Sequence, residues 1–69
     1  MASSVYKVIE LVGSSPKSFE DAIAGAVEKA SKTLRDLRVA EVVRQDVTIE
    51  EGKVKLYRAR INVSFRYED

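Results

Sequence analysis

The feature that most constrains the fold of this 69-residue chain is a single stretch with the apolar periodicity of an α-helix. Hydrophobic side chains recur there at steps of three and four residues: Phe19, Ala22, Ile23, Ala26, Val27, Ala30, Leu34 and Leu37. Two start signals precede this stretch. Ser15 is able to cap a helix that has Pro16 in its first turn, and Ser18 is able to cap one that has Asp21 three residues on. The pattern predicts one amphipathic helix with one apolar face.

The segments around this helix are rich in β-branched residues and predict three strands. One strand is expected before the helix, over 5–12. Two follow it, over 39–49 and 54–67, and the turn 50–53 joins them into a hairpin. The first strand reaches the sheet only through the helix, so the simplest arrangement puts the last strand in the middle, antiparallel to both others. The predicted class is α+β, with β-α-β-β order in one domain over 1–69 and a three-stranded antiparallel sheet curled around one helix.

The last predicted strand has two different faces, because successive side chains of a strand alternate. One face is apolar and forms the expected bed for the helix: Tyr57, Ala59, Ile61, Val63, Phe65 and Tyr67. The other face is polar: Arg58, Arg60, Asn62, Ser64 and Arg66. If the hairpin pairs about the turn, the partners across it are Gln45 with Arg58, Val43 with Arg60 and Glu41 with Asn62. Glu41 is then a diagonal neighbour of Arg60, close enough for a charged contact.

The second face of the sheet predicts self-association. One helix covers one face only, and the other leaves apolar side chains beside the arginines: Val39, Val43, Val54 and Leu56. So short a chain usually needs disulfides, a metal or other copies of itself to be stable. Cysteine and histidine are absent, which excludes disulfides and the commonest transition-metal ligands. A homo-oligomer is therefore the expected means of stabilisation.

Charge and composition exclude several classes of function. The chain has twelve basic and eleven acidic residues and no tryptophan. It therefore lacks the basic excess and the aromatic platforms that are typical of a nucleic-acid binder. No apolar stretch approaches the roughly 20 residues that span a bilayer. The start of the chain is unlike a signal peptide, so we expect a soluble cytoplasmic protein. Without cysteine or histidine no nucleophile–base pair can be assembled, and no enzymatic activity is expected.

Four segments of the chain resemble those of the dodecins, at ordered spacing and without a gap. They are residues 5–16 (VYKVIELVGSSP), 30–35 (ASKTLR), the pair Glu41-Val42 and residues 63–66 (VSFR). The resemblance implies a hollow homododecameric shell of cubic symmetry that binds a small ligand. In typical dodecins flavins are stacked in pairs between tryptophans at two-fold contacts, and several members bind coenzyme A near the three-fold contacts.

The positions that match the flavin site of the family are altered in this chain. Val39 stands where the family has the stacking tryptophan, and Arg58 replaces the glutamine that hydrogen-bonds the flavin ring. Asp46 stands where bacterial members have an arginine, and Arg38 where the residue before the tryptophan is acidic. A carboxylate repels a flavin phosphate, and an arginine offers donors but no acceptor. Ordinary flavin storage is therefore not expected.

Two other ligands are favoured over flavin by the resemblance. The residues that match the family's coenzyme A contacts keep a basic or hydroxyl character suited to phosphate groups: Lys7, Lys29, Thr33, Arg35 and Arg66. The runs 38–40 (RVA) and 45–46 (QD) resemble a tryptophan-less, calcium-binding dodecin subgroup. Gln45 and Asp46 supply oxygen donors of the kind that calcium prefers, although two donors suffice only if several chains contribute.

Structural explanations stand beside these functional ones. The cations of the helix, Lys29, Lys32 and Arg35, also suit a solvated helix face. The strand arginines 58, 60 and 66 are expected to pair with Glu10 or Glu41 across subunits, and Asp46 is also explained as a bulge or edge residue. For the whole protein the alternatives are a structural assembly whose pockets are vestigial, and an atypical flavin-storage dodecin in which other side chains replace the tryptophan.

We predict that riboflavin binds this protein far more weakly than it binds a tryptophan-containing dodecin. Each stacked pair would lose two aromatic contacts, each contributing about 0.5–1.5 kcal/mol beyond the area it buries. Quenching of flavin fluorescence measures the binding, and strong quenching at submicromolar protein would contradict the prediction. The double substitution Val39→Trp with Arg58→Gln should restore part of the binding, because it returns both the platform and the acceptor.

Overall fold

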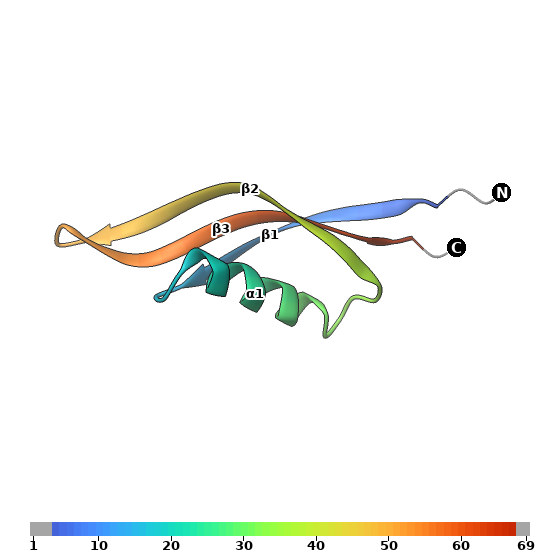
Figure 1. Ribbon diagram of the computed structural model, residues 1–69, viewed down its shortest axis with the longest axis horizontal. Coiled ribbons are helices and arrows are strands. Elements are labelled where there is room, and N and C mark those ends of the chain that lie inside the picture. Colours follow the sequence, from blue (N-terminus) through green and yellow to red (C-terminus); the bar gives the residue numbers. More distant parts are fainter. Residues whose placement is uncertain (1–3, 68–69) are drawn as a thin grey trace.

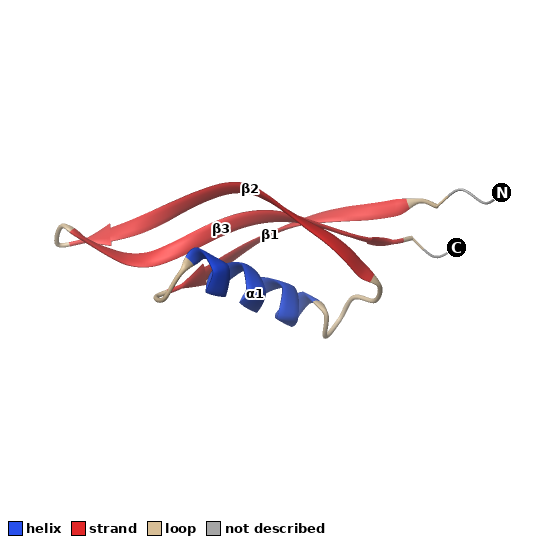
Figure 2. Cartoon of the chain, viewed as in Figure 1, coloured by secondary structure: helices blue, strands red, loops and turns tan. Residues whose placement is uncertain are grey.

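Residues 4–67 are described by the computed structural model, and they form one helix and three strands in β-α-β-β order (Figure 1). Strand β1 spans Tyr6–Ser15, helix α1 Phe19–Ala30, β2 Leu37–Glu50 and β3 Lys53–Arg66. The order across the sheet is β1-β3-β2, and β3 pairs antiparallel with both neighbours. The predicted α+β class and the central place of the last strand are therefore confirmed. The β2–β3 hairpin extends beyond the helix, in a molecule 56 Å long and 14 Å thick (Figure 2).

Helix α1 begins at the second of the two predicted start signals. The Ser18 hydroxyl accepts a hydrogen bond of 3.0 Å from the backbone N–H of Asp21, as an N-cap does. Ser15, the alternative cap, is instead the buried last residue of β1. Its hydroxyl donates to the Asp21 carboxylate at 2.7 Å and accepts from the N–H of Lys17 at 2.9 Å. Ser15 thus fixes the strand-to-helix connection from outside the helix.

The helix ends earlier than the apolar pattern predicts. Helix α1 ends at Ala30, and neither Leu34 nor Leu37 is part of it. The N–H groups of Thr33 and Leu34 both bond to the Ala30 carbonyl, which closes the last turn. Asp36 then has a φ of 57°, in the left-handed region, and redirects the chain into β2. Leu37 still reaches the core, but from the first position of β2.

The core lies between α1 and the face of β3 that the alternation predicted. Ala59, Ile61 and Val63 are buried there, and six side chains pack against them: Ile9, Leu11, Ile23, Ala26, Val27 and Leu37. Complete burial of a side chain such as Ile61 contributes about 1.5–3 kcal/mol. Near the start of the helix, Phe19 meets Tyr57 edge-to-face at a centroid distance of 5.1 Å. Helix α1 packs chiefly on β1 and β3, so the sheet face away from it, here called the outer face, carries no other element of residues 4–67.

Two β-bulges make most of the predicted hairpin register wrong. Glu41 does lie opposite Asn62, as predicted, but Arg58 faces Asp46 and Arg60 faces Arg44. Lys55 is left unpaired between Leu56 and Val54, which shifts the register by one residue; the unpaired Val43 shifts it back. Between the bulges every β2 side chain is therefore on the face opposite to the predicted one. A third irregularity leaves Arg38 unpaired at the start of β2.

Gly13 allows β1 to lie close to the helix, and we predict that Gly13→Ala destabilises the subunit. A Cβ at this position would meet the Ala22 carbonyl oxygen and would lie 3.0 Å from the Ala26 Cβ, so strand or helix must move. Overpacking of this kind costs about 1–3 kcal/mol. Gly25→Ala is the matched control, because nothing lies within 4 Å of its Cβ and a helical glycine costs about 0.5–1 kcal/mol relative to alanine. Denaturant unfolding at one fixed subunit concentration should rank the control above the native chain and Gly13→Ala below it. A Gly13→Ala protein as stable as the native chain would contradict the close packing.

Candidate ligand-binding sites

An open pocket of about 350 Å³ lies between β1 and the C-terminal part of α1. Its lining is apolar except at two positions, and comprises Leu11, Val12, Ala26, Lys29, Ala30 and Thr33. Lys29 is in the last turn of α1 and Thr33 is in the turn that follows it, and both line the same pocket. The Thr33 hydroxyl makes only a long contact, 3.4 Å, to the Ala30 carbonyl. The pocket therefore joins an apolar wall to one ammonium and one hydroxyl group.

The structure brings together only two of the five residues predicted to contact a coenzyme A-type ligand. Lys29 and Thr33 share the pocket beside α1. Lys7 lies on β1 opposite Phe65, and Arg66 ends β3 opposite Tyr6. Arg35 belongs to the connection between α1 and β2. One chain thus assembles part of the predicted set, and the whole set needs either a long ligand or a second chain. The apolar periodicity alone assigns the apolar lining residues to the core, but Ala26 and Ala30, four residues apart on α1, lie beside Lys29 in this pocket.

Asp46 and Arg58 form a two-point ion pair on the outer face. Arg58 donates from Nε to one carboxylate oxygen at 2.7 Å and from Nη2 to the other at 3.1 Å. The two residues are direct partners across β2 and β3, and both side chains are about half exposed. The hydrogen bond from Arg58 holds the pKa of the Asp46 carboxyl below its ordinary value, against some desolvation, and the positive charges of Arg60 and Arg44 act in the same direction. The same bond raises the pKa of the Arg58 guanidinium. Both oxygens of Asp46 are thus engaged.

The positions equivalent to the flavin site do not converge within one chain. Val39 lies opposite Ser64, six β3 residues from Arg58, a separation of about 20 Å along a strand. Arg38, unpaired in the sheet, lies 4.0 Å from the Asp36 carboxylate. A common site that contains Val39 and Arg58 therefore needs a second chain.

The two proposed calcium donors lie on opposite sides of the sheet. Gln45 is opposite Ala59, a residue of the core face, whereas Asp46 is opposite Arg58 on the outer face. Within residues 4–67 no group of three acidic side chains is placed to hold a metal ion. A calcium site that uses both Gln45 and Asp46 stays a prediction that depends on several chains.

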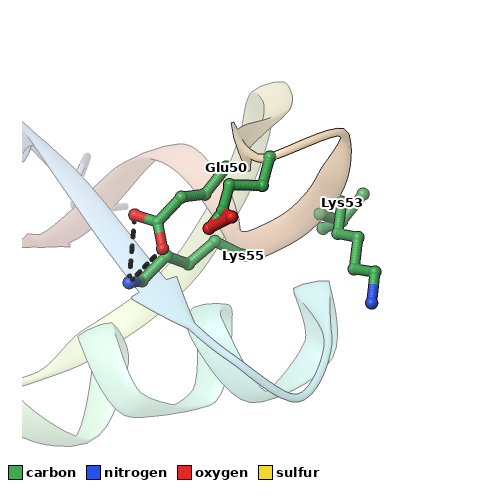
Figure 3. Close-up of a pocket in the computed structure, with 5 residues that line it drawn as sticks. Glu50, Lys53 and Lys55 are labelled. Carbon is green, nitrogen blue, oxygen red and sulfur yellow. Dashed lines mark hydrogen bonds and ion pairs between the residues drawn. The ribbon is translucent and has the colours of Figure 1, made fainter.

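A second pocket, of about 400 Å³, lies at the tip of the β2–β3 hairpin (Figure 3). It is lined by Glu50, Glu51, Lys53, Val54 and Lys55. The Lys55 ammonium contacts both carboxylate oxygens of Glu50, at 3.1 and 3.2 Å, while Lys53 points away from this pair. Such exposed ion pairs contribute about 0–1 kcal/mol. The mixed charge of this exposed turn favours neither an anionic nor a cationic ligand.

Arg60 pairs differently from the sequence-based expectation. Its Nη1 lies 3.1 Å from Oε1 of Glu10, within one chain rather than across subunits. The expected contact of Arg60 with Glu41 is not formed, and among residues 4–67 neither Glu41 nor Arg44 makes an ion pair. The reason is the register, because the bulge at Val43 places Arg44 opposite Arg60 and β1 brings Glu10 to its other side.

Comparison with known proteins decides the family. The model of the Dodecin family matches residues 5–68. This chain belongs to the dodecin family. The calcium dodecin of Mycobacterium tuberculosis is 44% identical over 63 residues, which cover 91% of this chain and 89% of that protein. The dodecin of Thermus thermophilus is 46% identical over 65 residues, which cover 94% of each.

Solved dodecin structures share the whole fold. The dodecin of Streptomyces coelicolor superposes with a TM-score of 0.94 at 38% identity, covering 100% of this chain and 99% of that one. The crystal structure of the calcium-chelating calcium dodecin of Mycobacterium tuberculosis gives a TM-score of 0.83 at 45% identity, covering 94% and 93%. The resemblance seen in the four sequence segments is therefore confirmed. Among residues 4–67 of this dodecin, α1 is too short and too polar to cross a membrane.

We predict that Arg58→Gln returns the pKa of Asp46 toward its ordinary value. In the native chain the lowered pKa means that the pair stabilises the fold above the unfolded-state pKa, and that this contribution is lost as the pH falls through the folded-state pKa. Carboxyl carbon NMR of Asp46 measures the titration directly. Lys55→Gln, which removes a separate ion pair at the hairpin tip, is the control and should leave the Asp46 titration unchanged. An unaltered Asp46 pKa in Arg58→Gln would show that the pair does not persist in solution.

Proposed function

We propose that this dodecin is a non-enzymatic subunit of a closed cytoplasmic homododecameric shell that sequesters a small ligand, and that a coenzyme A-type nucleotide is the ligand it suits best. In this proposal residues 1–69 act as one domain. The observation that carries it is the pocket beside α1, which presents Lys29 and Thr33 at the edge of an apolar wall. An ammonium attracts phosphate groups, a hydroxyl hydrogen-bonds them, and an apolar wall accepts the uncharged part of the ligand.

The remaining predicted contacts suit a shell better than a single chain. Lys7, Arg35 and Arg66 lie outside the pocket, so one nucleotide reaches them either through its own length or where neighbouring subunits bring them near. A ligand with several phosphate groups and a long uncharged arm has the length to touch such dispersed cations. This reasoning supports a ligand held between subunits.

Calcium is the second candidate, and similarity favours it. A relative that is 44% identical to this chain is a calcium dodecin. The geometry of one subunit argues the other way, because Arg58 engages both oxygens of Asp46 and Gln45 lies on the opposite face. A cation at Asp46 would have to displace a guanidinium that binds at two points. Calcium therefore ranks below the nucleotide in this proposal.

Flavin ranks last among the three ligands. Val39 offers no aromatic platform, and the Arg58 guanidinium is committed to Asp46. An atypical flavin site, or a shell whose pockets are vestigial, remains the outcome expected if the nucleotide does not bind.

We predict that coenzyme A binds the assembled protein and that Lys29→Gln weakens this binding about tenfold, because a charge-assisted hydrogen bond contributes about 1.5–3 kcal/mol before solvent screening. Isothermal titration calorimetry with coenzyme A measures the affinity. Lys32→Gln is the matched control, since it removes the same charge near the end of the same helix but does not line the pocket. Equal affinity in both variants would refute the assignment of Lys29, and no heat with the native protein would favour vestigial pockets. Parallel titrations with calcium chloride and riboflavin rank the other ligands.

A further inference from the structure

Glu41 and Arg44 are two unmatched charges on the same side of β2. Both lie on the outer face, where Glu41 is opposite Asn62 and Arg44 is opposite Arg60. Neither forms an ion pair with another residue of 4–67. The other charges nearby are satisfied, since Arg58 binds Asp46 and Arg60 binds Glu10. One acidic and one basic group thus stand free, three residues apart on one strand.

The bulge at Val43 causes this arrangement. In a regular strand, residues three apart point to opposite faces. The extra residue at Val43 brings Arg44 onto the face that carries Glu41, directly opposite another arginine. Like charges in direct cross-strand positions destabilise a sheet unless an anionic group meets them. Arg60 receives Glu10 from the β1 side, so the unmet requirement lies at Arg44.

Apolar side chains surround these two charges. Val39, Val43, Val8 and Val12 are 62%, 49%, 56% and 49% exposed, and β1 and β2 carry them on either side of β3. A face with exposed valines and unpaired charges of both signs is suited to burial against a surface with the same composition. The occupant that matches it in charge and in apolar character is another copy of the same face.

A two-fold axis between two copies would pair each of these two unmatched charges with an opposite charge. In an isologous contact each residue i of one chain meets residue j of the other, and j meets i. An axis that lies between the two outer faces, perpendicular to β2 and level with the midpoint of positions 41 and 44, would place each free carboxylate beside a free guanidinium, twice per contact. We propose that a second copy of this chain covers the outer face about such an axis, with Arg44 of each chain paired with the partner subunit's Glu41. The contact deepens the shell proposed above and rests on it.

Charge reversal tests this pairing. Arg44→Glu and Glu41→Arg each create two like-charge contacts per interface. Because such contacts oppose association, the protein concentration at half-assembly should rise at least about tenfold for each variant alone. Light scattering measures this concentration. In an equimolar mixture, the two acidic groups of the first variant meet the two basic groups of the second, so the mixture should assemble as the native chain does. An ion pair within one chain cannot be rescued by mixing. Lys53→Glu, the same reversal in the turn, is the control and should assemble normally.

The outcomes separate this pairing from the shell itself. Native protein that stays monomeric would overturn both proposals. A native shell with single variants that assemble equally well, or with a mixture that fails to recover, would overturn the pairing and leave the shell standing. The neutral variants Arg44→Gln and Glu41→Gln guard against misfolding by charge repulsion. If the two groups meet across subunits, each neutral variant weakens assembly several-fold and the double variant weakens it little further; additive losses would contradict the pairing.

Discussion

The period-two alternation of β3 is the constraint on which the rest of this structure depends. It places Ala59, Ile61 and Val63 beneath α1 and, by the same geometry, places Arg58 and Arg60 on the outer face. Burial of the first set holds the helix on the sheet, and Gly13 lets the helix lie close enough for that burial to be complete. A strand that builds a core on one side therefore builds a charged surface on the other.

The pairing of charges within one subunit underlies the proposed ranking of ligands. Asp46 and Arg58 occupy each other, which removes from ligand binding two positions that the resemblance associates with flavin and calcium. The pocket beside α1 has no such internal partner for Lys29, within residues 4–67, and keeps an apolar wall beside it. A group already paired at two points contributes little to a new ligand, whereas an unpaired ammonium retains its full attraction for phosphate. This difference is the physical basis for ranking the nucleotide first.

The two bulges connect the fold to the proposed self-assembly. The extra residue at Lys55 displaces β2 by one position, and the extra residue at Val43 restores it, so the β2 residues between them, 44–48, exchange faces. Without the exchange Arg58 would face Gln45, and Arg44 would point toward the helix side of the sheet. With the exchange, the outer face gains the Asp46–Arg58 ion pair, and it gains Arg44 as an unpaired arginine near the unpaired Glu41. Local irregularities of this kind redirect charge without any change in the element order.

The sequence by itself determined the class, the order of the elements and the face of β3 that forms the core, because apolar periodicity is a local property that survives in the tertiary structure. It also contained the correct N-cap at Ser18, although Ser15 and Pro16 gave an equally good signal. The helical pattern did not mark the end of the helix, because Leu37 belongs to the same apolar series but packs on the core from β2, after the turn at Asp36. Only the tertiary structure decided which charges meet. The partner of an arginine on β3 depends on the pairing register of the hairpin, and a single bulge shifts that register by one residue without a clear mark in the sequence.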